Sequence, residues 1–136
     1  MNSEQGITNT SENKRQVFDL QERLINFSLL ILKIIEELPN SLVAKHISNQ
    51  LIRCGTSPTA NYAEATSAES RDDFIHKMKI SLKELRETNI WLTLIHRKSL
   101  LKGNDLVNEA LSEVNELIAI FVSSISTAKQ NKLKSK

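Results

Sequence analysis

The sequence has few of the residues that make turns. Its 136 residues include only three glycines and two prolines. Hairpins and tight turns use both residue types, so a chain this poor in them has room for few connections. No segment alternates apolar and polar residues in the manner of a strand. The sequence therefore predicts an all-α protein built from a small number of long helices.

The chain also has a single cysteine, Cys54. One cysteine excludes an internal disulfide and a cysteine-rich zinc site, and it is typical of a reducing compartment. Residues 1–15 are polar and lack the apolar segment of a signal peptide. The apolar run 27–35 contains Ser28 and Lys33 and is too short to cross a bilayer. We therefore expect a cytoplasmic protein that does not associate with membranes.

The net charge is only +2, which does not by itself indicate a nucleic-acid partner. Its distribution is uneven: residues 41–102 carry ten Lys/Arg and six Asp/Glu, whereas residues 103–128 carry four Asp/Glu and no Lys/Arg. Residues 129–136 then hold four lysines. A basic block and an acidic block of this kind suggest helices that pair by charge, within one chain or between two.

Four segments have the apolar periodicity of amphipathic helices, at residues 15–38, 41–67, 70–98 and 104–128. Ser41 is the expected cap of the second, and Ser67 or Ser70 of the third. Connections this short make consecutive helices antiparallel neighbours. Residues 15–128 are therefore predicted to form one up-down-up-down antiparallel four-helix bundle. A disordered tail (1–14) is expected before it and a frayed basic tail (129–136) after it.

The first predicted helix carries a second apolar line beside its core stripe. Phe18, Ile25 and Leu32 recur at seven-residue intervals, and Leu29 widens the line. One partner face cannot cover both stripes. Either this helix is deeply buried in the bundle, or the second line, Phe18, Ile25, Leu29 and Leu32, meets another subunit.

Gly55 and Pro58 interrupt the second predicted helix. A proline inside a helix removes one backbone hydrogen bond and clashes with the preceding turn. The sequence therefore predicts a kink near residues 55–58 or a restart of the helix there, and Ser57 is the candidate cap of a restarted helix.

No residue pattern indicates catalysis. A di-metal site in a four-helix bundle needs two Glu-x-x-His motifs, and the chain has one approximate match, Asp73 to His76. Cys54 has no neighbouring base, and Gly55 stands alone where a phosphate-binding loop would need several glycines. We predict no enzyme activity, no cofactor, no metal site and no small-molecule substrate.

Polar residues on the second and third predicted helices share faces. Asn61 and Glu64 lie three residues apart, as do Glu84 and Glu87. Across antiparallel neighbours they could form a buried network that fixes which helices pair and in what register. The alternative is an ordinary solvated charged face. The candidates for the structural polar network are Arg53, Asn61, Glu64, Ser81, Glu84 and Glu87.

The same stretch carries a specific motif. It reads Gln50-Leu51-x-Arg53-Cys54-Gly55-Thr56-Ser57-x-x-Ala60-Asn61-Tyr62-Ala63-Glu64-Ala65, then Asp73-Phe74-Ile75-His76-Lys77 and Leu82-Lys83-Glu84-x-Arg86-Glu87-Thr88-x-x-Trp91-Leu92. This closely resembles the bacterial four-helix bundle family called S23, or the 23S rRNA intervening-sequence protein family. The resemblance covers the second and third helices; the other two match only as amphipathic patterns. Many members have Asn-Ile-Ala-Glu-Gly at positions 61–65, and Pro58 is placed differently from their proline.

The resemblance implies a left-handed bundle that assembles into a ring-shaped homopentamer. Such a ring would account for the second apolar line on the first helix, and it favours the structural network. The biochemical function of the family is mostly unassigned. Some members are encoded inside intervening sequences of 23S rRNA genes. A related branch, the accessory protein of diversity-generating retroelements, works with a reverse transcriptase and binds nucleic acid through a basic barrel.

Two functions remain open. The first is a non-enzymatic homo-oligomeric scaffold that binds RNA or DNA by its backbone, because a ring would multiply a modest basic patch into a strong field. Interleaved glutamates and scarce aromatic surface speak against it. The second is a protein-interaction module that docks a partner such as a polymerase without binding nucleic acid. The candidate nucleic-acid contacts are Lys77, Lys79, Lys83, Arg86, Arg97, Lys98, Lys102, Lys129, Lys132 and Lys134.

Overall fold

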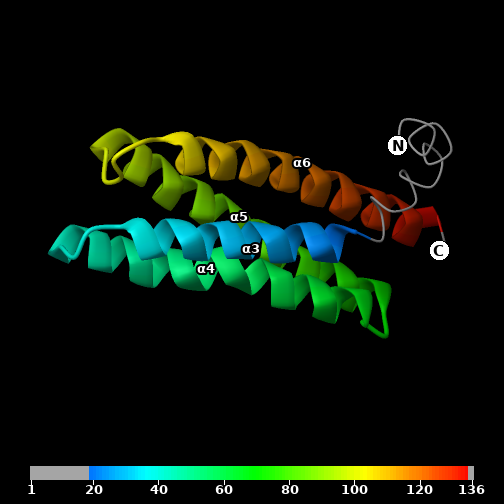
Figure 1. Cartoon of the computed structure of the whole chain (residues 1–136). Coiled ribbons are helices and arrows are strands. Elements are labelled where there is room, and N and C mark those ends of the chain that lie inside the picture. Colours follow the sequence, from blue (N-terminus) through cyan, green and yellow to red (C-terminus); the bar gives the residue numbers. More distant parts are fainter. Residues whose placement is uncertain (1–18, 135–136) are drawn as a thin grey trace, which may run out of the picture.

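The computed structural model describes residues 19–134, and within that range the chain forms four α-helices and no strand. They are α3 (Leu20–Glu37), α4 (Leu42–Thr66), α5 (Arg71–Lys98) and α6 (Asp105–Lys134). The helices run alternately in opposite directions (Figure 1). The predicted all-α four-helix bundle is confirmed, and its left-handedness stays a prediction. The predicted tail 1–14, the helix start at residue 15 and Phe18 lie outside the described residues.

Serine side chains set the beginnings of α4 and α5. Ser41 Oγ accepts a hydrogen bond from the backbone N–H of Ala44 at 3.1 Å, and Ser70 Oγ accepts one from Asp73 at 3.0 Å. Both serines have extended backbones, as N-cap residues do, and each satisfies an N–H that has no partner within its helix. The predicted cap Ser41 is confirmed, and Ser70 is the cap of α5.

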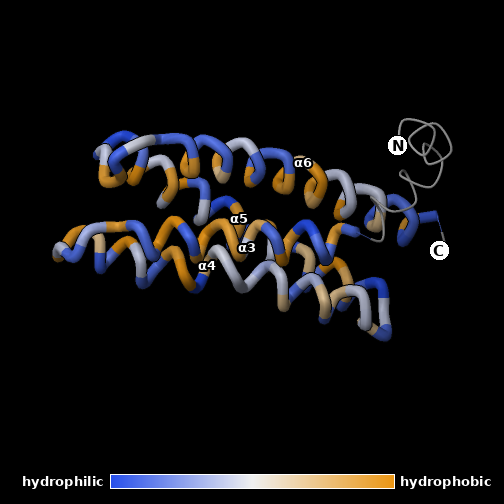
Figure 2. The backbone as a smooth tube through the Cα atoms, in the orientation of Figure 1, coloured by the Kyte–Doolittle hydropathy of each residue, from blue (hydrophilic) through white to orange (hydrophobic). Residues whose placement is uncertain are grey.

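Each helix packs on its neighbours in the chain, and α3 also packs on α6, which closes the bundle. Across the diagonal of the bundle, the ring of Tyr62 on α4 meets that of Phe121 on α6 edge-on, at 5.9 Å between centroids. Hydrophobic positions recur along each helix (Figure 2), and the largest fully buried side chains include Phe27, Phe121, Met78 and Leu51. Burying such a side chain contributes about 1.5–3 kcal/mol relative to leaving it exposed. Among the helices of residues 19–134, none combines the length and hydrophobicity that a bilayer span requires.

The packing of α3 against α4 depends on Gly55. A Cβ added there would lie 2.8 Å from Cγ2 of Ile31, which is fully buried, so only a glycine lets the two helices approach this closely. Polar atoms line the same seam. Ser28 Oγ lies 2.6 Å from Thr59 Oγ1, which donates to the carbonyl oxygen of Leu24 at 3.1 Å. These bonds set the register of the two helices.

The predicted restart of α4 is wrong. The chain stays helical from Leu42 through Thr66, with Pro58 buried inside the helix. Ser57 does not begin a new helix; its Oγ donates to the carbonyl oxygen of Arg53 at 2.6 Å, and Thr56 Oγ1 donates to that of Ile52 at 2.5 Å. Packing of α4 on both α3 and α5 keeps the segment helical, since hydroxyl bonds to carbonyls one turn back tend to bend a helix. A bend of the axis at residues 55–58 stays a prediction.

The predicted end of the last helix at residue 128 is also wrong, because α6 continues to Lys134. The basic residues that suggested a frayed tail favour a helix C-terminus, where the helix dipole is negative. Lys132 Nζ pairs with the carboxylate of Asp72 at the start of α5. This pair ties the last turns of α6 to the bundle.

Candidate functional site

Arg53 on α4 reaches two carboxylates on α5. Its Nη1 donates to Glu84 Oε2 at 3.0 Å and its Nη2 to Glu87 Oε1 at 2.8 Å. Glu84 and Glu87 lie three residues apart and present their side chains on one face of α5. The pKa of Arg53 is raised, chiefly by the charge of Glu87 and then by that of Glu84. These bonds link α4 to α5, and the role of the cluster in fixing the register of the two helices stays a prediction.

The Arg53 cluster lies at the surface, which differs from the predicted buried network. Half of the Arg53 side chain is exposed, against 17% of Glu84. Trp91 Nε1 donates to the same Glu87 oxygen at 3.4 Å, and the indole meets the His46 ring edge-on at 5.7 Å between centroids. A guanidinium is easily kept in contact with water, so the charges avoid the desolvation cost that full burial would impose.

The other predicted members of the network do not join Arg53. Glu64 pairs with Lys77 at 3.5 Å, more than two turns of α4 away from Arg53. Ser81 is fully buried, and its Oγ has no hydrogen-bond partner among the described residues. Asn61 is half-buried and is not part of the Arg53 cluster. Sequence spacing places these residues on shared faces, but the rotation of the helices decides which ones meet.

Cys54 is buried beside the Arg53 cluster and is not set up as a nucleophile. Burial raises the pKa of its thiol to about 11. A reactive cysteine needs the opposite shift and a nearby base. Within residues 19–134 there is also no group of three or more His, Cys, Asp or Glu side chains that could hold a metal ion.

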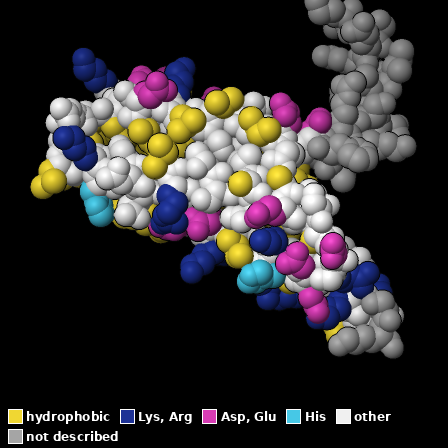
Figure 3. All heavy atoms as spheres, turned by 90° about the horizontal axis from the view of Figure 1, so that it is seen from below, with side chains coloured by type: hydrophobic (Ala, Val, Ile, Leu, Met, Phe, Trp, Pro, Cys, Tyr) yellow, Lys and Arg dark blue, Asp and Glu magenta, His cyan; other side chains and the backbone are white. Residues whose placement is uncertain are grey.

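The predicted basic contacts lie in three places. Lys77, Lys79, Lys83 and Arg86 follow α5; Arg97, Lys98 and Lys102 lie where α5 ends; Lys129, Lys132 and Lys134 lie at the end of α6. Lys77 and Lys132 pair with carboxylates. Because α5 and α6 are antiparallel, Lys79 is brought beside Lys129, and the charge of Lys79 lowers the pKa of Lys129. Figure 3 shows dark blue and magenta side chains interspersed over the lower right part of the view.

The predicted oligomer interface on α3 is open to solvent in the single chain. Leu29 is 58% exposed, Ile25 is also exposed, and Leu32 is half-buried. Ile52 on α4 is exposed too, and it lies one turn before Gly55, on the side of α4 that faces α3. Figure 3 shows hydrophobic side chains gathered over one part of the face seen from below. We call Ile25, Leu29, Leu32 and Ile52 the α3–α4 apolar face.

A second apolar surface lies between α4 and α5, at the end where α4 begins. It is an open groove of about 520 Å³, lined by Leu42, Val43, His46, Ile47, Trp91, Leu94 and Lys98. Leu42 is 87% exposed. This groove was not predicted from the sequence. Leu42 and Val43, two adjacent apolar residues directly after the Ser41 cap, were the signal that could have found it.

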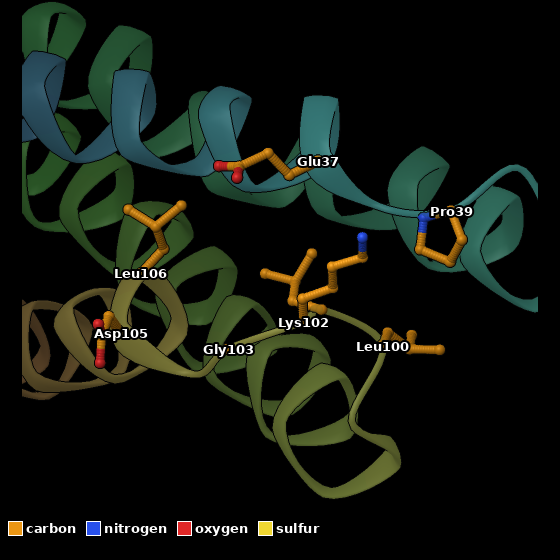
Figure 4. Close-up of a pocket in the computed structure, with 8 residues that line it drawn as sticks. Glu37, Pro39, Leu100, Lys102, Gly103, Asp105 and Leu106 are labelled. Atoms are coloured by element: carbon orange, nitrogen blue, oxygen red, sulfur yellow. The ribbon is translucent and has the colours of Figure 1, made fainter.

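The two connections at this end of the bundle border another depression, of about 570 Å³. Figure 4 shows the Lys102 side chain extending toward the segment that carries Glu37 and Pro39, with Leu100 on the opposite connection and Leu106 in the first turn of α6. No nucleophile with a neighbouring base lines it. The lining fits packing between two loops better than a site for chemistry.

Arg23 forms an ion-pair cluster that the sequence analysis missed. Its Nε and Nη2 donate to the two oxygens of Glu113 at 2.7 and 2.8 Å, and Nη2 also lies 3.2 Å from Glu116. The hydrogen bond that Arg23 donates to Glu113 is the main cause that raises the pKa of Arg23. Glu113 and Glu116 are three residues apart within the acidic block, which was the available signal. Their partner shows that part of the acidic block is neutralised within the chain.

Comparison with known proteins finds a family and solved structures to which the chain is similar. The family described as 23S rRNA-intervening sequence protein matches residues 17–123. A solved structure is similar over 77% of this chain and 96% of its own, with a TM-score of 0.71 and 32% sequence identity. That structure is a protein of unknown function from the S23 ribosomal protein family of Bacteroides thetaiotaomicron. No curated protein matches the chain.

Proposed function

Because the chain belongs to the 23S rRNA-intervening sequence protein family, we propose that it is a non-enzymatic scaffold that assembles with copies of itself and binds RNA or DNA through basic side chains. The assembly proposed is a ring of five. The observation that carries the proposal is the α3–α4 apolar face, where Leu29 is 58% exposed and Ile25 and Ile52 are exposed beside it. Soluble proteins rarely leave contiguous apolar surface uncovered unless a partner meets it.

Self-assembly also explains the two apolar stripes of α3. The inner stripe, with Leu24, Phe27 and Ile31, is buried within the chain. The outer stripe is only partly covered by the described residues of the same chain, which leave Leu29 58% and Ile25 37% exposed. If the surface that meets it lies elsewhere on a second copy, the contact repeats around a closed ring.

The nucleic-acid part of the proposal is supported by the basic side chains of α5 and α6. The names of both matched groups refer to ribosomal RNA or the ribosome. Lys79, Lys83 and Lys129 are exposed, and a ring would repeat them on every copy. Repeated lysines bind phosphates without reading sequence and release counterions, so the affinity falls steeply with salt.

The test is the binding of a single-stranded RNA oligonucleotide and of duplex DNA, measured by fluorescence anisotropy between 50 and about 300 mM salt. Wild-type protein is expected to bind at low salt with a steep salt dependence. The variant Leu29→Glu should bind at least about tenfold more weakly, because it loses the avidity of the ring. Ser112→Glu, an exposed position on α6, adds the same charge and should bind as wild type. A flat titration at the lowest salt would remove the nucleic-acid part.

A second function is favoured by the groove between α4 and α5. Its apolar lining and the 87% exposure of Leu42 suit the docking of an apolar segment of a partner protein, such as a polymerase. Trp91, the only tryptophan of the chain, lines the groove and reports its coverage. An emission maximum that stays at the same wavelength while the protein assembles would leave the groove open for such a partner. A blue shift on assembly would instead mean that a second copy covers the groove.

A further inference from the structure

An open groove of about 490 Å³ lies between the first half of α5 and the end of α6. Asp72, Ile75, His76 and Lys79 line it from α5, and Lys129, Lys132 and Leu133 line it from α6. Ile75 is nearly fully buried and forms its apolar floor. Three lysines and a histidine therefore surround a space in which only one lining residue is acidic.

Two of these lysines repel each other. The pKa of Lys129 is lowered, and the charge of Lys79 is its largest cause. Neither lysine forms an ion pair with a carboxylate among the described residues. Their neighbours Lys132 and Lys77 do, with Asp72 and Glu64. The pair thus stands out from the other basic residues at this end of the bundle.

Helix dipoles do not explain this placement. The negative end of α6 favours Lys132 and Lys134, which lie in its last turn. Lys79 instead lies in the third turn of α5, nearer to the positive end of that helix, where a cation gains nothing. For the stability of the fold, a neutral residue at position 79 or 129 would do as well as the lysine. An anion between the two ammonium groups would turn their repulsion into attraction.

We propose that the groove formed by His76, Lys79, Lys129 and Lys132 binds a phosphate group of a nucleic-acid backbone. Ammonium groups suit phosphate as point charges with several donors, and they contact it without reading the base. The proposal rests on the nucleic-acid part of the proposed function and names where one strand would be held. The shallow groove leaves room for the sugar and the rest of the chain to continue along the surface.

The experiment compares RNA binding by wild-type protein and the double variant Lys79→Gln/Lys129→Gln, with a fluorescein-labelled single-stranded 12-mer RNA. The matched control is Lys33→Gln/Lys45→Gln, which removes the same charge from exposed positions on α3 and α4. We expect the groove variant to bind about tenfold more weakly at 50 mM salt, with a salt slope smaller by about 0.7–1.4, corresponding to one or two lost phosphate contacts. The control should remain within about twofold of wild type.

The outcomes separate the two proposals. Equal weakening in both double variants, or none in the groove variant while wild type binds, overturns the groove and leaves nucleic-acid binding in place. No binding by wild type overturns both. In a second arm, inorganic phosphate is titrated while backbone amide NMR shifts are followed. The result that assigns the groove to free phosphate has two parts: phosphate shifts the amide signals of residues 76–79 and 129–132 with saturation below about 1 mM, and RNA does not shift them. That result would overturn the backbone proposal.

Discussion

At Gly55 the bundle depends on the absence of a side chain. We expect Gly55→Ala to destabilise the protein by about 1–3 kcal/mol, since the new Cβ meets the buried, β-branched Ile31 and forces the two helices apart. The gain in helix propensity, about 1 kcal/mol, offsets part of this cost. Urea unfolding followed by circular dichroism measures the difference. Gly103→Ala is the control, because nothing lies within 4 Å of its added Cβ; equal stabilities of the two variants would refute the close-contact explanation.

Cys54 is expected to be a poor nucleophile. With a pKa of about 11, its thiolate fraction at pH 8 is about a hundredfold below that of a thiol at the usual pKa of 9.0. Reaction with a disulfide reagent should therefore be slow in the native protein and fast in denaturant. Because the pKa is raised by folding, the associated stability is present below about pH 9 and is lost as the pH rises toward about 11. Rapid native labelling at pH 8 would show that the thiol is not buried as described.

For single residues, the sequence predicts the interactions that form between neighbours in the chain. Ser41 and Ser70 cap helices because their hydroxyls bond to the first turn of their own helix. The unpartnered Oγ of Ser81 and the ion pair of Glu64 with Lys77 could not be predicted, since both depend on contacts between helices.

At the scale of the elements, the hydroxyls of Ser28 and Thr59 join α3 to α4. We expect Thr59→Val to cost about 1 kcal/mol, because the carbonyl oxygen of Leu24 and Ser28 Oγ lose a partner. Ser28→Ala keeps the bond from Thr59 to Leu24. A double-mutant cycle by urea unfolding should give a coupling of about 0.5–1.5 kcal/mol. A coupling near zero would mean that the two hydroxyls do not hold the helices in register.

The Lys79–Lys129 pair makes a prediction about the contact of α5 with α6. Lys129→Gln should raise the melting temperature, because it removes the repulsion that lowers the pKa of Lys129. The gain in melting temperature should shrink with added salt, because salt screens exposed charges. It should also shrink as the pH rises through the lowered pKa of Lys129, because the wild-type protein then loses this charge itself. Lys132→Gln, which removes an ion pair with Asp72, should give no such gain. A lower melting temperature for Lys129→Gln at low salt would contradict like-charge repulsion.

The four helices could be predicted because each has an apolar stripe. The continuity of α4 and the end of α6 could not. Pro58 and the terminal lysines are local signals for a break, and tertiary contacts override both. Pro58 is buried within an uninterrupted α4, and Lys132 binds Asp72 at the start of α5. The meeting of Lys79 with Lys129, fifty positions apart in the chain, likewise follows from the antiparallel packing of α5 on α6.

At the scale of the whole molecule, the buried core of the bundle differs from its outer surface, which carries the candidate binding surfaces. The core holds no site for a metal or a nucleophile among its described residues. Its outer surface carries the α3–α4 apolar face, the groove beside Trp91 and the lysine groove between α5 and α6. The sequence predicts the first of these through the seven-residue spacing of Ile25 and Leu32. Each of the two grooves is lined by residues of two helices, so the sequence of one segment does not predict it.

The proposed assembly rests most directly on the mass of the protein in solution. Sedimentation equilibrium of wild-type chain at about 100 μM should give several times the 15.4 kDa of one copy, and five times that mass for the ring. Leu29→Glu should sediment as a single copy with unchanged helical circular dichroism, while Ser112→Glu assembles as wild type does. A wild-type mass of 15.4 kDa at that concentration would contradict self-assembly through the α3–α4 apolar face.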